Sequence, residues 1–237
     1  MEFQPLIPPP LSPLPPGEGK WGFLRLHQNL SLRLGEQKGT FCKGLKRVNS
    51  VKVSETSLEG VLIIEPDVFG DNRGFFMETY HQERYAKLGI EPVFVQDNLS
   101  WSARGTLRGL HYQLPHTQAK LVQAIKGEIF DVVVDIRLGS STFGRWSGFH
   151  LSDENKRQLY IPEGFAHGFC VLSETALFLY KCSDFYAPDS ELGVLWNDPD
   201  LEIEWPVKDP IISDKDDKYP FLKDVPPEHF PVYEVDL

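Results

Sequence analysis

From about Val61 onward, apolar and polar residues alternate in short runs that are separated by Gly, Pro, Asn and Asp. Alternation with a period of two is typical of β-strands, because successive side chains point to opposite faces of a sheet. Residues 129–137 show the pattern most clearly. Their apolar face comprises Phe130, Val132, Val134 and Ile136, and their other face includes Asp131, Asp135 and Arg137. We therefore expect a strand over 129–137.

The same pattern predicts nine further strands and one short helix. The strands are Gly60–Glu65, Gly74–Tyr80, Pro92–Leu99, Leu107–Gln113, Ala119–Lys126, Trp146–Leu151, Gln158–Ile161, His167–Val171 and Ala176–Asp184, and the helix is Gln82–Leu88. A parallel α/β sheet needs a crossover helix between strands, and this chain has almost none to offer. The pattern therefore favours an all-β jelly roll with few short helices.

Residues 1–50 differ in composition from the rest of the chain. Met1–Pro16 holds seven prolines, and the whole segment has more basic than acidic residues although the full chain carries a net charge of −10. Proline without a hydrophobic period predicts extended, unpacked chain. We expect residues 1–50 to be a disordered, Pro-rich and basic extension, and residues 51–237 to form the jelly-roll domain with an irregular C-terminal segment. Met77, the one internal methionine, lies inside the predicted domain and cannot begin a complete one. Because a valine codon can serve as a bacterial start, we expect a product that begins at Val51, with the extension not native.

Charge, hydropathy and cysteine content narrow the classes of function. A net charge of −10 argues against nucleic acid as a partner, because phosphate contacts need clustered Lys and Arg. Apolar runs fall far short of the roughly 20 residues that span a bilayer, so we expect no membrane association. Three cysteines without CxxC spacing predict neither a disulfide framework nor a zinc site, and they fit a cytoplasmic protein.

Several polar residues lie within or beside the predicted strands, where a purely structural sandwich would have apolar ones. They are Arg108, His111, Lys120, His167 and Tyr180. Buried cations are costly unless they are paired or face a ligand, so the group predicts an anion-binding cavity in the barrel. Strict alternation puts Arg108 and His111 on opposite faces. Both can reach one cavity only if the strand bulges, and Gly109 is a suitable position for a bulge.

Seven segments, in order along the chain, resemble one enzyme family. They are Val68–Phe76, Val95–Asn98, Leu107–His111, Ala119–Val122, Ile161–Phe169, Phe178–Lys181 and Leu195–Asp198. Together they resemble the dTDP-4-dehydrorhamnose 3,5-epimerase family over about Val51–Lys218. The resemblance implies a cupin-type jelly roll, a homodimer and a dTDP-sugar substrate, with no metal and no redox cofactor.

The resemblance also implies roles for individual residues. His111 matches the proton acceptor, Tyr180 the proton donor and Asp216 the carboxylate that orients the histidine, while Lys120 matches the group beside the sugar C4 oxygen. Tyr186 matches the residue that stacks on thymine. Further positions match contacts to the sugar nucleotide, namely Arg73, Glu78, Gln96, Asp97, Asn98, Arg108, His167, Glu191 and Lys215.

These residue types suit the implied reaction, which inverts C3 and C5 of dTDP-4-dehydro-6-deoxy-D-glucose to give dTDP-4-dehydro-L-rhamnose in dTDP-L-rhamnose biosynthesis. Inversion beside a ketone removes a proton from one face and returns a proton to the other through an enolate. A neutral histidine suits the base and a neutral tyrosine suits the acid. A lysine at the C4 oxygen would stabilise the enolate more than the ketone.

Two alternatives remain open. A related enzyme that inverts only C3 or only C5 would have nearly the same sequence features. A non-catalytic sugar-binding cupin is expected to lack His111 or Tyr180, and both are present here. A metal-dependent cupin would need an HxH pair, which His111-Tyr-Gln113 does not provide.

Overall fold

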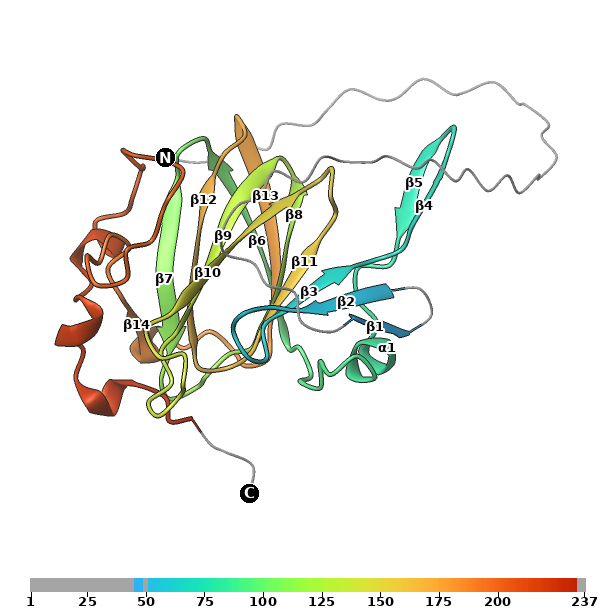
Figure 1. The fold of residues 1–237 in the computed structure, drawn as a ribbon. Coiled ribbons are helices and arrows are strands. Elements are labelled where there is room, and N and C mark those ends of the chain that lie inside the picture. The colour runs from blue at the N-terminus through green and yellow to red at the C-terminus, as the bar shows by residue number, and fades with distance from the viewer. Residues whose placement is uncertain (1–44, 49–50, 234–237) are drawn as a thin grey trace, which may run out of the picture. The chain divides into compact units, whose positions relative to one another are not determined.

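Two antiparallel sheets face each other and form a barrel in the computed structural model, which describes residues 45–48 and 51–233 (Figure 1). The larger sheet has seven strands in the order β1 (Leu45–Val48), β2 (Val51–Glu55), β3 (Leu62–Glu65), β11 (Gln158–Ile161), β8 (Lys120–Lys126), β13 (Thr175–Cys182) and β6 (Gln96–Ala103). The smaller sheet has five strands in the order β10 (Trp146–Ser152), β9 (Glu128–Asp135), β12 (Phe165–Val171), β7 (Leu107–Gln113) and β14 (Glu191–Gly193). This arrangement confirms the predicted all-β jelly roll.

Helical structure is sparse among the described residues. There is one short α-helix, α1 (Gln82–Ala86), at the predicted place. Four 3-10 turns lie in the C-terminal half, namely η1 (Pro188–Ser190), η2 (Asp216–Lys218), η3 (Leu222–Asp224) and η4 (Pro227–His229). In Figure 1 the last three lie beside β7 and β14, outside the smaller sheet. No described helix is long and apolar enough to cross a membrane.

Strand bounds follow the pairing partners more than the local sequence. β7 and β11 have the predicted bounds, whereas the strand predicted at Pro92–Leu99 is observed as β6 at Gln96–Ala103. β6 pairs with β13 from Gln96 opposite Cys182 to Ala103 opposite Thr175, so the length of β13 determines where β6 begins and ends. The short strands β2, β4 (Val68–Asp71) and β14 have no counterpart in the prediction.

Strand β1 lies inside the range that the sequence assigns to a disordered extension. It pairs antiparallel with β2, from Leu45 opposite Ser54 to Val48 opposite Val51. The remainder of residues 1–50 lies outside the described residues, so the predicted disorder and the proposed start at Val51 stay predictions.

Three clusters of buried apolar residues hold the layers together. The first fills the space between the two sheets and includes Phe178 and Val133. The second joins the smaller sheet to the C-terminal turns and includes Leu222. The third packs Tyr85 of α1 against the larger sheet. Since each fully buried side chain of this size contributes about 1.5–3 kcal/mol, the clusters account for the layered packing.

Strand β9 confirms the face assignment made for residues 129–137. Its predicted apolar face belongs to the cluster beneath the C-terminal turns. Its other face points into the barrel, where Ile129 and Val133 join the inner cluster and Asp131 is fully buried. The alternation is therefore correct, but both faces of this central strand are covered by protein.

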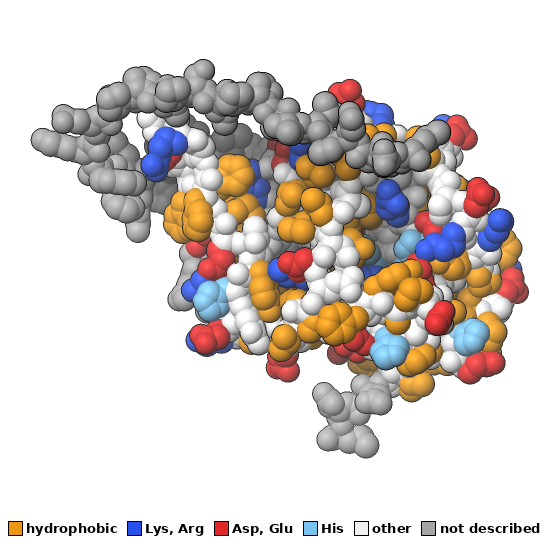
Figure 2. Space-filling model, turned by 180° about the vertical axis from the view of Figure 1, so that it is seen from behind, with side chains coloured by type: hydrophobic (Ala, Val, Ile, Leu, Met, Phe, Trp, Pro, Cys, Tyr) orange, Lys and Arg blue, Asp and Glu red, His pale blue; other side chains and the backbone are white. Residues whose placement is uncertain are grey.

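The hairpin of β4 and β5 (Gly74–Met77) extends away from the barrel (Figure 1). Its aromatic side chains are largely exposed, with Phe69 at 63%, Phe75 at 61% and Phe76 at 70%. Figure 2 shows apolar side chains on the projecting part at the left of that view. Exposed aromatic groups at this density are uncommon on the surface of a monomeric protein.

Candidate active site

A cavity of about 320 Å³ lies between the two sheets. It receives side chains from both sheets, from the segment after β13 and from η2. The polar residues that line it are Ser100, Arg108, His111, Lys120, His167, Tyr180, Tyr186, Glu191, Ser213, Lys215 and Asp216. The five polar residues that the strand pattern singled out therefore meet in one place, as predicted.

Strict alternation would place Arg108 and His111 on opposite faces of β7, and a bulge in this strand lets both reach the cavity. In the pairing with β12, His111 lies opposite His167 and Arg108 lies opposite Phe169, so two residues of β7 face the single residue Gly168. Gly109 sits in the bulge at a φ of +124°, and a Cβ there would lie 2.5 Å from the Cα of Gly168. Only glycine fits this position, which confirms the predicted bulge.

His111 is hydrogen-bonded to a buried carboxylate. Its Nε2 lies 2.9 Å from Oδ1 of Asp216, whose side chain is 4% exposed. The second carboxylate oxygen of Asp216 accepts a hydrogen bond from the backbone N–H of Gly109 at 3.2 Å. The backbone N–H of Asp216 donates to Ser213 Oγ at 3.1 Å. Because the carboxylate is anchored from the bulge, it fixes both the orientation and the tautomer of the imidazole.

The same contacts keep Asp216 ionised. Burial on its own raises the pKa of this carboxyl, but the hydrogen bond and charge of His111, with the N–H of Gly109 and the hydroxyl of Ser213, together lower the pKa below its usual value. An ionised Asp216 would stabilise an imidazolium at His111.

A second histidine and carboxylate pair lies deeper in the barrel, and one of its members was not predicted as a site residue. His167 Nε2 lies 3.0 Å and 2.9 Å from the two carboxylate oxygens of Asp131. Burial raises the pKa of Asp131, while the contact with His167 and the charge of Lys120 oppose the rise. The signal in the sequence was a carboxylate inside an apolar strand, which is costly unless it is paired.

Lys120 and Tyr180 enter the cavity from the larger sheet, opposite His111 and His167. Burial lowers the pKa of Lys120, opposed by the charges of Cys182, Asp131 and Glu191. Burial also raises the pKa of Tyr180, so its phenol stays protonated at neutral pH. The cavity thus has a hydrogen-bonded imidazole on one wall, and a neutral phenol and a lysine on the other.

At the mouth of the cavity, Tyr186, Glu191 and Lys215 form a chain of contacts. The Tyr186 hydroxyl donates to Glu191 Oε2 at 2.6 Å, and Lys215 Nζ donates to Glu191 Oε1 at 2.7 Å. Burial raises the pKa of Glu191, but these two hydrogen bonds, with the charges of His111 and Lys215, outweigh burial and lower the pKa below its usual value. Tyr186 itself is 51% exposed and presents an aromatic surface at the entrance.

Five residues that the resemblance assigns to nucleotide contacts do not line this cavity. They are Arg73, Glu78, Gln96, Asp97 and Asn98. Arg73 pairs with Asp71 in the turn of the β4–β5 hairpin, and Glu78 pairs with Arg84 of α1. Asp97 accepts Lys181 Nζ at 2.9 Å on the outer part of β6. The chain therefore brings part of the predicted set together and leaves the rest outside.

The described residues contain no group of three or more His, Cys, Asp or Glu side chains arranged to hold a metal ion. His111 and His167 are each bound to a carboxylate, and Cys170 is buried as a free thiol. His116 lies at the surface, where its Nδ1 contacts Asp184 at 3.1 Å.

Comparison with known proteins gives a consistent result. The model of the dTDP-4-dehydrorhamnose 3,5-epimerase family matches residues 55–224. The dTDP-4-dehydrorhamnose 3,5-epimerase of Shigella flexneri is 58% identical over 168 residues, which cover 70% of this chain and 93% of that protein. A dTDP-4-dehydrorhamnose 3-epimerase of Streptomyces niveus is 42% identical, covering 70% of this chain and 81% of that protein.

A solved structure agrees with the fold. The dTDP-6-deoxy-D-glucose-3,5-epimerase of Legionella pneumophila, in complex with dTDP-4-keto-L-rhamnose, has a TM-score of 0.76 and 51% sequence identity. The match covers 78% of this chain and all of that chain. The cavity between the two sheets holds a carboxylate-bound histidine, a tyrosine and a lysine, and with these relatives the chain belongs to the dTDP-4-dehydrorhamnose 3,5-epimerase family and is an isomerase of dTDP-L-rhamnose biosynthesis.

Proposed function

We propose that this epimerase uses His111 as the base and Tyr180 as the acid to invert C3 and C5 of dTDP-4-dehydro-6-deoxy-D-glucose. The observation that carries the assignment is the His111–Asp216 pair on one wall of the cavity, with Tyr180 entering from the facing sheet. Inversion needs proton removal and proton return on opposite faces of the sugar. Two facing groups satisfy that requirement.

The reaction consists of two equivalent inversions, one at each carbon beside the C4 ketone. His111 takes the proton from the carbon beside the ketone, and the electron pair of that C–H bond moves to form an enolate on the C4 oxygen. Lys120 stabilises the developing charge, which is absent from the ketone, and so lowers the barrier. Tyr180 then donates its proton to the opposite face of the same carbon. Proton exchange with solvent restores both groups before the second carbon reacts.

The mouth of the cavity fits the nucleotide part of the substrate. Arg108 and Lys215 line the cavity and supply positive charge for the pyrophosphate, and charge-assisted bonds of this kind are among the strongest polar contacts. Tyr186 offers an exposed ring for stacking on the thymine. The relative from Legionella, whose complex contains dTDP-4-keto-L-rhamnose, supports the same class of ligand for this chain.

We propose a homodimer in which the β4–β5 hairpin contacts the second copy. The hairpin exposes Phe69, Phe75 and Phe76, and it carries Arg73, which the family resemblance assigns to the nucleotide although it does not line the cavity of its own chain. The edge strand β6 adds Leu99 and Trp101, which are 59% and 62% exposed. A second copy would cover these apolar groups, and a two-fold axis would make the contact reciprocal.

Incubation with dTDP-4-dehydro-6-deoxy-D-glucose in heavy water tests the function. NMR is expected to show deuterium at both C3 and C5 of the product. Deuterium at one carbon only would support a single-position enzyme, the class to which the Streptomyces niveus relative belongs. Deuterium at neither carbon would overturn the proposed reaction.

A further inference from the structure

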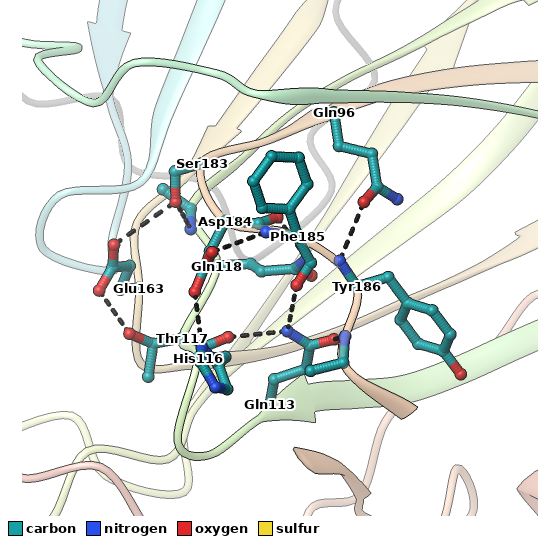
Figure 3. Close-up of polar contacts among 12 residues, drawn as sticks. Gln96, Gln113, His116, Thr117, Gln118, Glu163, Ser183, Asp184, Phe185 and Tyr186 are labelled. Atoms are coloured by element: carbon teal, nitrogen blue, oxygen red, sulfur yellow. Dashed lines mark hydrogen bonds and ion pairs between the residues drawn. The ribbon is translucent and has the colours of Figure 1, made fainter. Parts of the chain in front are cut away.

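Tyr186 lies in the segment between β13 and η1, which does not pair with a neighbouring strand. Glutamine side chains instead bind the backbone of this segment (Figure 3). In that view Gln113 lies beneath the segment, Gln118 beside it and Gln96 above it. Gln118 Nε2 donates to the carbonyl of Asp184 at 2.8 Å. Irregular backbone of this kind has no ladder to define its path, so side-chain contacts define it.

Gln113 makes the largest number of these contacts. Its Nε2 donates to the carbonyls of His116 at 2.7 Å and Phe185 at 3.3 Å, and its Oε1 accepts the N–H of Ala187 at 2.9 Å. The side chain is 5% exposed, so water does not replace these bonds. Only a carboxamide supplies two donors and an acceptor in this geometry.

These contacts hold the backbone of Tyr186 and its hydroxyl, and they leave the ring half exposed. Gln113 binds the residue before it and the residue after it, Gln96 Oε1 accepts its backbone N–H at 2.9 Å, and Glu191 accepts its hydroxyl. Gln96, which the sequence assigned to the nucleotide, therefore has its carbonyl oxygen committed to the backbone of Tyr186. The aromatic ring is fixed by its two neighbours, its own amide and its hydroxyl.

We infer that Gln113 is a positioning residue for nucleotide binding, which acts by holding the backbone on both sides of Tyr186. The inference rests on the proposed role of Tyr186 as the stacking partner of the base. Gln113 follows His111 by two residues on β7 and shares its side of the strand. One strand thus carries the base of the reaction and the support of the nucleotide site. A pre-formed stacking surface avoids the entropic cost of ordering the segment on binding.

The variant Gln113→Glu tests this inference. Its carboxylate still accepts the N–H of Ala187 but cannot donate to the carbonyls of His116 and Phe185, so the segment loses its hydrogen bond at Phe185 and the loop after β7 loses the one at His116. We expect the KM for the dTDP-sugar and the Kd for dTDP to rise about tenfold, with kcat within about twofold of the original. A parallel rise in both constants identifies the nucleotide end of the site.

The pH dependence separates positioning from a general structural defect. A buried carboxyl that faces two carbonyls is expected to have a raised pKa, and its protonated form regains one donor. The ratio of the Kd for dTDP of Gln113→Glu to that of the unchanged protein should therefore decrease as the pH is lowered from 8 to 5.5. A ratio that is constant over this range would contradict the inference.

Thr117→Val is the matched control, because Thr117 belongs to the same network in Figure 3 and its hydroxyl bonds Glu163 at 2.5 Å, not the Tyr186 segment. Its KM is expected to stay within twofold. If the unchanged protein incorporates no deuterium into the sugar, the proposed function fails. If the protein is active and Gln113→Glu has an unchanged KM, or loses kcat at constant KM, the positioning role fails alone.

A measurement on the unchanged protein covers the case in which Gln113→Glu does not fold. Hydrogen exchange of residues 183–187 should be slow before any ligand is added, because the amides of Tyr186 and Ala187 are already bonded. Addition of dTDP should slow the exchange little further. Fast exchange that becomes slow only with dTDP would show that the ligand, and not Gln113, orders the segment.

Discussion

The cavity and the β4–β5 hairpin both carry residues that the sequence assigns to the sugar nucleotide, but their surroundings are opposite. In the cavity, charged groups are buried and paired, as in the contacts of Asp216 with His111 and of Asp131 with His167. On the hairpin, the ion pair of Arg73 and Asp71 is exposed. Its phenylalanines, which would be buried in a core, are exposed as well. The charged groups of the cavity thus find their partners within one chain, whereas the aromatic side chains of the hairpin remain exposed on it.

The largest expected effect is at the base. His111→Ala should reduce deuterium incorporation at C3 and at C5 by about 10²–10⁴-fold, because positioned general-base catalysis contributes that much. Binding of dTDP should change little, since the residues proposed to contact the nucleotide lie elsewhere in the cavity. His150→Ala is the control, as His150 is an exposed histidine paired with Glu128 away from the cavity. Exchange at the original rate in His111→Ala would exclude this residue as the base.

Tyr180→Phe is expected to separate the two half-reactions. Removal of the hydroxyl leaves the ring packed against Phe178 but takes away the proton donor on the second face. Washout of a deuterium label from the substrate should continue, while the yield of inverted product falls about 10²-fold. NMR of labelled substrate and product measures both quantities. An unchanged yield of inverted product would assign the acid role to another residue.

Gly109 beside the cavity and Gly74 on the hairpin allow a direct comparison of the two regions, because both have a positive φ. An alanine at Gly109 would place its Cβ 2.5 Å from the Cα of Gly168, whereas a Cβ at Gly74 meets no atom within 4 Å. Gly109→Ala should lower the free energy of unfolding by roughly 2–6 kcal/mol through strain and overpacking. Gly74→Ala carries only the conformational strain, about 1 kcal/mol. Urea denaturation measures both, and equal losses would contradict the bulge as a close backbone contact.

Substitution on the hairpin should act on assembly more than on folding. Phe76→Ser is expected to raise the dissociation constant of the dimer about 30-fold, because an aromatic group at the centre of an interface contributes about 2 kcal/mol or more. Sedimentation measures this constant. Val232→Ser, at an equally exposed site near the C-terminus, should leave the dimer intact. A protein that sediments as a monomer at micromolar concentration before any substitution would refute the proposed dimer.

Deletion of residues 1–50 is expected to have the smallest effect. Every residue proposed for the site lies beyond residue 50, and the family match begins at residue 55. The value of kcat/KM should stay within about twofold, and the melting temperature should fall by no more than a few degrees. Deletion of residues 1–55 is the matched control, since it also removes β2 with its buried Val51 and Val53 and should cost roughly 3–6 kcal/mol. A large loss of stability from the shorter deletion would show that residues 1–50 pack on the domain.

Local patterns were sufficient for most of the strands and for part of the site. The alternation over residues 129–137 predicted both faces of β9, and the conflict between Arg108 and His111 predicted the bulge at Gly109. These predictions succeed because they depend only on the two-residue repeat of a strand and on the steric freedom of glycine. The bounds of β6 were wrong because pairing with β13, and not its own residues, determines them.

The sequence by itself determined an all-β chain, the five polar strand residues that meet in the cavity, and a family resemblance that supplied Asp216 as the partner of His111. Only the tertiary structure decided that Asp131 pairs with His167, that Gln113 binds the backbone around Tyr186, and that Arg73 lies outside the cavity. The physical reason is the distance along the chain over which each effect acts. Strand periodicity and glycine geometry act between near neighbours in the chain, whereas the partner of a buried polar group depends on which strands the whole barrel brings face to face.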